Sequence, residues 1–64
     1  MRFSVGQAVN YHPPHSLRAP LGPYVVRAVR PERDGEVQYN IKHPRETHER
    51  IVSESELIEP EDVP

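Results

Sequence analysis

Apolar and polar residues alternate along much of this chain, with the period of two that is typical of β-strands with one buried face. The clearest stretch is residues 36–42, in which Val37, Tyr39 and Ile41 alternate with polar side chains. Residues 24–30 form a short run rich in β-branched side chains, which favours a central strand. The pattern therefore predicts an all-β protein with these two runs as neighbouring strands.

Prolines and glycines mark the connections between the strands. Residues 12–23 hold four of the eight prolines, and proline cannot donate to a regular hydrogen-bond ladder. This segment predicts a long first loop with polyproline character, after a first strand at about residues 7–11. Between the two central runs, Asp34-Gly35 predicts a tight hairpin, because glycine supplies the positive φ that the turn needs.

The C-terminal third predicts two short strands joined by one turn. After a polar turn at residues 43–48, residues 49–52 predict a fourth strand. Ser53 stands three residues before Glu56, the spacing of a capping box that satisfies free backbone N–H groups. We expect one 3₁₀-like turn there, followed by a brief last strand at residues 57–59.

The apolar positions in phase with these strands predict the core. They are Val9, Val26, Val37, Tyr39, Ile41, Ile51 and Leu57. Each of the three tyrosines is in phase with an apolar neighbour, so we expect their rings in the core and their hydroxyls at its rim. Exposed rings for stacking on bases or caging a cation are therefore not expected.

Length and composition limit the class of protein. A chain of 64 residues and 7.4 kDa has room for one small core, which we place at residues 1–59 with a frayed acidic tail at 60–64. The absence of cysteine excludes disulfides and thiolate metal sites and favours a cytoplasmic setting. No apolar stretch approaches the ~20 residues that span a bilayer, and no leader is evident, so we expect a soluble, complete protein.

Charge is distributed unevenly between the two halves. The net charge is −2, but residues 1–30 carry +4 without an acid, whereas residues 31–64 carry −6. A strongly basic nucleic-acid domain is not indicated, because affinity for phosphates comes from clustered lysine and arginine. A smaller basic stripe could still form from Arg18, Arg27, Arg30 and Lys42.

Glycines, turn residues and a closing acidic turn follow one another at characteristic spacings. The segments are Phe3-x-x-Gly6-x-x-Val9, Gly22-Pro23-Tyr24, Gly35-x-x-Gln38-Tyr39-x-Ile41 and Glu49-Arg50-Ile51-Val52-x-Glu54-Ser55-Glu56-Leu57. This order, over residues 3–58, resembles small stand-alone SH3-like barrel proteins of bacteria. The resemblance implies a small SH3-like barrel of four to five antiparallel strands, with a long proline-rich first loop and one 3₁₀ turn near the C-terminus. It implies no activity, because this fold serves many functions.

Residues that could carry chemistry are few. No nucleophile or carboxylate pair stands beside a base and an orienting group, so we predict that the protein is not an enzyme. His12 and His15 could be joined by His43 and His48 as metal ligands if two loops met. Without thiolates or a nearby carboxylate we expect solvated loop histidines, and we predict no metal and no cofactor.

These observations favour a non-enzymatic protein-interaction module. The predicted partner-binding residues, in the proline loop and on the neighbouring strand face, are His15, Leu17, Arg18, Arg27, Arg30 and Lys42. Leu17 and Leu21 lie in a stiff loop that would lose little entropy on binding a protein, although both could instead form a lid over the core, the interpretation we favour for Leu21. The alternatives are a weak RNA- or nucleoprotein-binding barrel that uses the basic stripe, and an accessory subunit of a larger enzyme.

Overall fold

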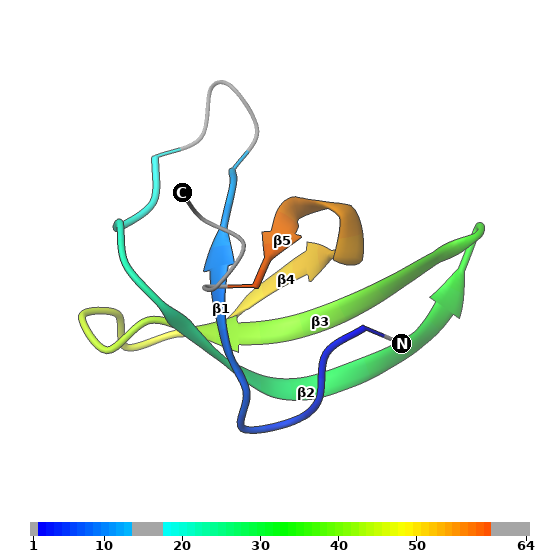
Figure 1. Cartoon of the computed structure of the whole chain (residues 1–64), viewed down its shortest axis with the longest axis horizontal. Helices are drawn as coiled ribbons and strands as arrows, with labels where there is room; N and C mark the ends of the chain where they lie inside the picture. Colours follow the sequence, from blue (N-terminus) through cyan, green and yellow to red (C-terminus); the bar gives the residue numbers. More distant parts are fainter. Residues whose placement is uncertain (1, 14–17, 60–64) are drawn as a thin grey trace.

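The computed structural model describes residues 2–13 and 18–59. It is all-β apart from one short 3₁₀ helix, as the alternating pattern predicts (Figure 1). The elements are β1 (Ala8–Tyr11), β2 (Tyr24–Arg33), β3 (Glu36–Lys42), β4 (Arg50–Ser53), η1 (Glu54–Glu56) and β5 (Leu57–Ile58). Among these residues no helix has the length and hydropathy to cross a bilayer. The predicted tail at 60–64 lies outside the described residues.

The five strands form one antiparallel sheet in the order β4-β3-β2-β1-β5. Each strand pairs with the next along the chain as far as β4, and β5 returns to pair with β1. In the described part of the chain β4 and β5 are therefore the two edges, and the sheet is open. The closed barrel implied by the resemblance is not confirmed by this pairing.

The β2–β3 hairpin is longer than the sequence predicts, and it projects beyond the rest of the sheet (Figure 1). β2 continues through Pro31 because the register shifts there, between Arg30 and Arg33, and proline is tolerated in a strand where a bulge interrupts the ladder. The predicted tight turn is confirmed. Asp34 and Gly35 both have positive φ, 54° and 80°, as a type I′ turn requires.

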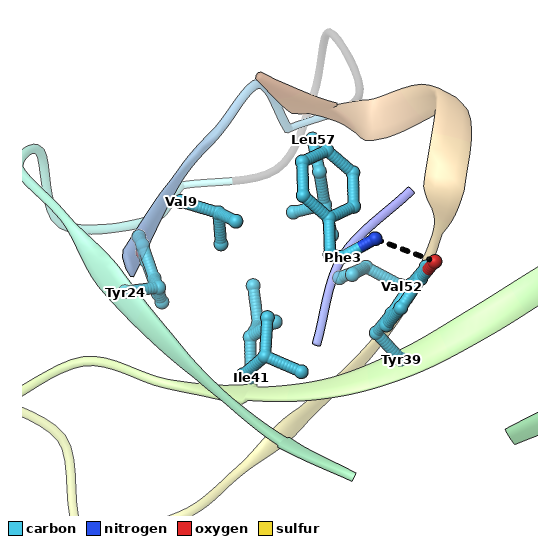
Figure 2. Packing of buried hydrophobic residues seen from close by; sticks show 8 residues of the cluster. Phe3, Val9, Tyr24, Tyr39, Ile41, Val52 and Leu57 are labelled. Atoms are coloured by element: carbon cyan, nitrogen blue, oxygen red, sulfur yellow. Dashed lines mark hydrogen bonds between the residues drawn. The ribbon is translucent and has the colours of Figure 1, made fainter. Parts of the chain in front are cut away.

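Eight apolar side chains fill the core on one face of the sheet (Figure 2). They are Val9, Tyr24, Val26, Tyr39, Ile41 and Leu57, all expected in the core from the sequence, together with Phe3 and Val52. Val37 is only half-buried. The prediction for Ile51 is wrong, because this residue pairs with the outward-facing Asn40 and is 55% exposed, whereas Val52 pairs with Tyr39 and is buried.

One part of the core is closed by the N-terminal segment. Phe3 is buried edge-on against Tyr39, with ring centroids 5.6 Å apart, and its N–H donates to the Tyr39 hydroxyl at 3.4 Å. That hydroxyl donates to the Glu54 carboxylate, which also accepts the Arg2 N–H at 3.0 Å. Burial raises the pKa of Tyr39, and the bond from Tyr39 lowers the pKa of Glu54. Three separate segments of the chain thus meet at one phenol.

The 3₁₀ turn η1 confirms the predicted capping box. The Glu56 carboxylate accepts a hydrogen bond of 2.9 Å from the Ser53 N–H. The chain then continues directly into β5, where Leu57 is buried opposite Tyr11 of β1. This short turn returns the chain to the far edge of the sheet.

Candidate functional site

The sheet has a solvent-facing side over β2, β3 and β4, which we call the outer face. Its residues are Val25, Arg27, Ala28, Arg30, Gln38, Asn40, Lys42, Glu49 and Ile51. Alternation along β3 places Gln38, Asn40 and Lys42 opposite to the buried Tyr39 and Ile41. Pairing across the sheet then adds the residues of β2 and β4 beside them.

A row of polar contacts crosses the outer face. Arg30 Nη1 donates to Asn40 Oδ1 at 3.5 Å, and Asn40 Nδ2 donates to Glu49 Oε1 at 3.0 Å. The other oxygen of Glu49 lies 3.8 Å from Arg27 Nε. The Arg27 and Glu49 side chains are 55% and 38% exposed, so this ion pair contributes little to stability. Its effect is to orient both side chains around Asn40.

The predicted basic stripe is found in part. Arg27, Arg30 and Lys42 share the outer face. Glu49, for which the sequence gives no signal, is brought beside Arg27 and Asn40 by the pairing of β3 with β4. Arg18 is exposed in the loop before β2, away from these strands in the sequence. Three cations and one carboxylate therefore occupy the face.

The other predicted partner-binding residues are in the first loop. His15 and Leu17 lie outside the described residues.

Exposed apolar side chains lie among these charges. Ile51 is 55% exposed on β4, and Val25 is 38% exposed on β2. Ala28, Asn40 and Ile51 lie side by side across three strands, with Asn40 in the middle. The outer face thus carries both apolar and cationic side chains.

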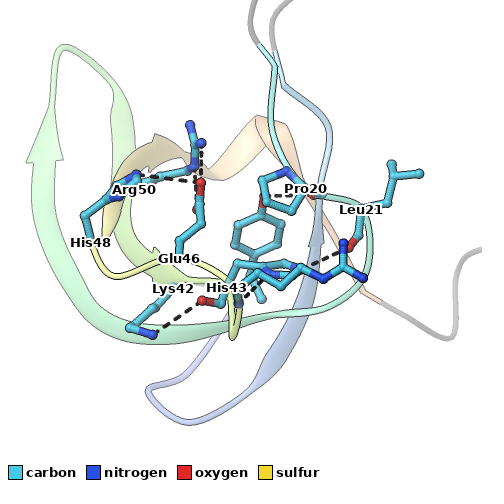
Figure 3. A network of polar contacts seen from close by, with 9 residues as sticks. Pro20, Leu21, Lys42, His43, Glu46, His48 and Arg50 are labelled. Carbon is cyan, nitrogen blue, oxygen red and sulfur yellow. Dashed lines mark hydrogen bonds and ion pairs between the residues drawn. The ribbon is translucent and has the colours of Figure 1, made fainter.

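The loop before β2 takes a different path from the one predicted. Leu21 is 91% exposed, so the expectation that it covers the core is wrong. The Tyr24 hydroxyl donates to the Pro20 carbonyl at 2.9 Å, and His43 Nε2 donates to the Leu21 carbonyl at 2.9 Å (Figure 3). These two bonds fix the backbone with the leucine side chain pointing away from the protein (Figure 3).

His43 is a structural residue of this region and not a solvated loop histidine. It is 5% exposed, and its ring stands edge-on to Tyr24 at 4.9 Å between centroids. Nδ1 accepts the Arg45 N–H at 3.0 Å, which leaves the proton on Nε2 for the Leu21 carbonyl. Both nitrogens of the neutral ring are therefore used in holding the loop.

An ion pair lies beside this histidine. Arg50 binds the Glu46 carboxylate through Nε at 2.9 Å and Nη2 at 2.6 Å, and the two side chains are only 18% and 11% exposed. The bidentate bond lowers the pKa of Glu46 and raises that of Arg50. The exposed His48 lies 3.7 Å from the same carboxylate. The neighbouring phenols, Tyr11 and Tyr24, have raised pKa values because packing against the core removes them from water.

The described residues offer little for small-molecule chemistry. Within them no three histidine or carboxylate side chains gather as metal ligands, so His12, His43 and His48 do not form the shared site considered from the sequence. No ligand-sized pocket is present in the same part of the chain. Phe3, Tyr24 and Tyr39 are buried, and Tyr11 packs against the core. Among the accessible groups are the side chains of the outer face and Leu21 in the loop before β2.

Comparisons with protein-family models, with curated proteins and with solved structures found no match to this chain.

Proposed function

We propose that this chain is a non-enzymatic protein-interaction module and that the outer face of its sheet is the docking surface. The observation that carries the proposal is the row of Ile51, Asn40 and Ala28 across three hydrogen-bonded strands, in which Ile51 is exposed and the other two are half-buried. Groups on paired strands have little freedom to lose on binding, which favours affinity. An open sheet surface fits a macromolecule better than a small ligand, which needs a concave site.

We also propose that the fold is of the SH3-like barrel type. The sheet order, with β5 returning to β1 after one 3₁₀ turn, supports this assignment. So does the long loop before β2 and the tight turn at Asp34-Gly35, because a small barrel of this type combines the same connections.

The charges of the outer face favour an acidic partner. Arg27, Arg30 and Lys42 outnumber the single carboxylate of Glu49, on a chain whose net charge is −2. Complementary charge speeds association and excludes partners of like charge. A protein surface with carboxylates around a small apolar patch would match the cations and Ile51 together.

The positions of the aromatic rings favour a protein partner over RNA. Single-stranded nucleic acid is bound largely by stacking of bases on exposed aromatic rings. Here Tyr24, Tyr39 and Phe3 are buried, and Tyr11 packs on the core. Cations alone would give an interaction that weakens steeply with salt, and a salt titration of the captured partner separates the two cases.

Capture from native cell extract with quantitative mass spectrometry tests the proposal. Ile51→Asp should lower recovery of a specific partner by about tenfold or more, because it replaces the most exposed apolar side chain of the outer face with a carboxylate. Val5→Asp is the matched control, since Val5 is 64% exposed and lies outside that face.

A second pair of variants tests the charges. Arg30→Glu should lower recovery, whereas Arg33→Glu near the hairpin tip should not. Equal recovery with Ile51→Asp and Val5→Asp, at equal thermal stability, would remove the outer face as the docking surface.

A further inference from the structure

The loop before β2 presents one leucine to solvent. Leu21 is 91% exposed, more than Val5, Ile51 or Val25, the other exposed large apolar residues of the described chain. Single exposed apolar residues are common on protein surfaces. What distinguishes Leu21 is the degree to which its backbone is fixed.

Two core side chains bind two successive carbonyl groups of this loop. The fully buried Tyr24 donates to the Pro20 carbonyl, and the buried His43 donates to the Leu21 carbonyl, each at 2.9 Å. Arg45 orients the imidazole through its own N–H, which bonds Nδ1 at 3.0 Å. The backbone on each side of the leucine side chain is therefore tied to the core.

Local backbone preferences hold the same geometry. Gly22 has a φ of +104°, which residues with a Cβ rarely adopt. A Cβ placed on Gly22 would lie 3.7 Å from His43 Nε2, an ordinary contact, so glycine is required for the dihedral angle and not for space. Pro20 and Pro23 restrict φ on either side of the turn.

These hydrogen bonds and backbone restrictions do not bury the leucine side chain. A loop residue that stabilises a small core does so by removing apolar surface from water, and Leu21 removes almost none. A preorganised apolar group instead lowers the entropy lost on binding. We propose that Leu21 is an anchor that inserts into a leucine-sized apolar pocket on a partner protein.

Charge indicates what surrounds that pocket. Arg18 and Arg45 are exposed, one three residues before Leu21 and the other bonded through its backbone to the histidine that holds Leu21. Glu46, the carboxylate beside this histidine, is already bound by Arg50. The pocket therefore has carboxylates on its rim.

This inference rests on the proposed function, since it needs a protein partner, but it uses a surface separate from the outer face. If Ile51→Asp abolishes capture while the Leu21 test fails, the outer face stands alone. The reverse result assigns docking to the loop.

Photo-crosslinking tests the anchor directly. A chain of 64 residues is within reach of chemical synthesis, so photo-leucine can replace Leu21 in one sample and Val5 in a matched control. Each folded protein is irradiated in native cell extract, and the crosslinked peptides are sequenced. Photo-leucine at position 21 should give about tenfold more adduct with one protein than photo-leucine at position 5. The attached peptide should carry aspartate or glutamate next to apolar residues.

Two further variants, each made in the position-21 sample, separate anchoring from accidental contact. Arg18→Gln with Arg45→Gln should lower the adduct yield severalfold while leaving the leucine in place. Gly22→Ala strains the positive φ and should also lower it, with the thermal melt confirming that the protein remains folded. Equal yields at positions 5 and 21, adducts only with a second copy of the chain, or yields unchanged by Gly22→Ala would overturn the proposal.

Discussion

Two irregular segments of this protein are held by core tyrosines, with opposite results. At the N-terminus, the Tyr39 hydroxyl accepts the Phe3 N–H, and Phe3 is 2% exposed. Before β2, the Tyr24 hydroxyl donates to the Pro20 carbonyl, and the neighbouring Leu21 is 91% exposed. A buried phenol fixes the backbone in both places, but only the first segment turns its apolar side chain inward.

The chemistry of the two regions also differs. Around Tyr39 the carboxylate of Glu54 accepts hydrogen bonds from the neutral phenol of Tyr39 and from a backbone N–H. Around Tyr24 the carboxylate of Glu46 forms an ion pair with the guanidinium of Arg50, close to the neutral His43. The comparison indicates that a hydrogen bond to the backbone specifies where a loop runs, whereas the direction of the apolar side chain decides whether the loop contributes to the core.

Truncating the two apolar side chains should give the largest contrast. Phe3→Ala should cost about 3–5 kcal/mol of unfolding free energy, because it empties a packed site beside Tyr39. Leu21→Ala should change it by no more than about 0.5 kcal/mol, since little contact is lost. Urea denaturation followed by circular dichroism measures both. Similar losses would show that Leu21 is part of the core in solution.

A matched pair of isoleucines sharpens the same distinction within the sheet. Ile41→Ala should cost about 2–5 kcal/mol, because Ile41 is fully buried. Ile51→Ala should cost far less, since Ile51 is 55% exposed. The same denaturation experiment compares them, and a large effect at Ile51 would contradict the observed register of β4.

The strands and the hairpin could be predicted from the sequence because alternation and turn residues are local signals. Val37, Tyr39 and Ile41 establish β3, and Asp34-Gly35 establishes its turn. In β4 the adjacent Ile51 and Val52 are both β-branched and give no parity signal. Their orientation depends on pairing with β3, which no local pattern encodes.

The candidate surfaces were predictable to a smaller extent. Parity places Arg27 and Lys42 opposite the core side chains, whereas Arg30 joins them only because the register shifts between Val26 and Ala28. Glu49 joins them through a contact between strands. The buried His43 binds the carbonyl of the exposed Leu21, so the positions of the two residues are linked. The path of a proline-rich loop does not follow from any periodic pattern, and the sequence therefore gives no sign of this link.

Removing the hydroxyls of Tyr39 and Tyr24 tests how strongly their hydrogen bonds hold the two segments. Tyr39→Phe should cost about 1–3 kcal/mol, because the buried Phe3 N–H would lose its acceptor. Tyr24→Phe should cost about 0.5–1.5 kcal/mol, the net value of one hydrogen bond. Thermal melts rank the pair. A larger loss for Tyr24→Phe would mean that the loop before β2, and not the N-terminal segment, is the more strongly held.

The two carboxylates of Glu46 and Glu54 should both make the stability of the protein depend on acid. The pKa of Glu46 and that of Glu54 are both lowered from the ordinary value of 4.5, by Arg50 and by Tyr39 respectively. A carboxyl group with a lowered pKa in the folded state stabilises the protein above its unfolded pKa. That contribution disappears as the pH falls through the folded value. Both groups therefore steepen the loss of stability below about pH 4.5.

Glutamine substitutions separate the two cases, with the smallest expected effect at Glu54. In Glu54→Gln the side-chain oxygen can still accept from Tyr39, so stability at neutral pH should change little while the acid dependence weakens. In Glu46→Gln the same weakening should be accompanied by a loss at neutral pH, because Arg50, 18% exposed, would lack a counter-charge. Denaturation curves from about pH 3 to 7 measure both effects. A neutral-pH loss at Glu54 equal to that at Glu46 would show that Tyr39 needs a charged acceptor, and the chemical difference between the two regions would not hold.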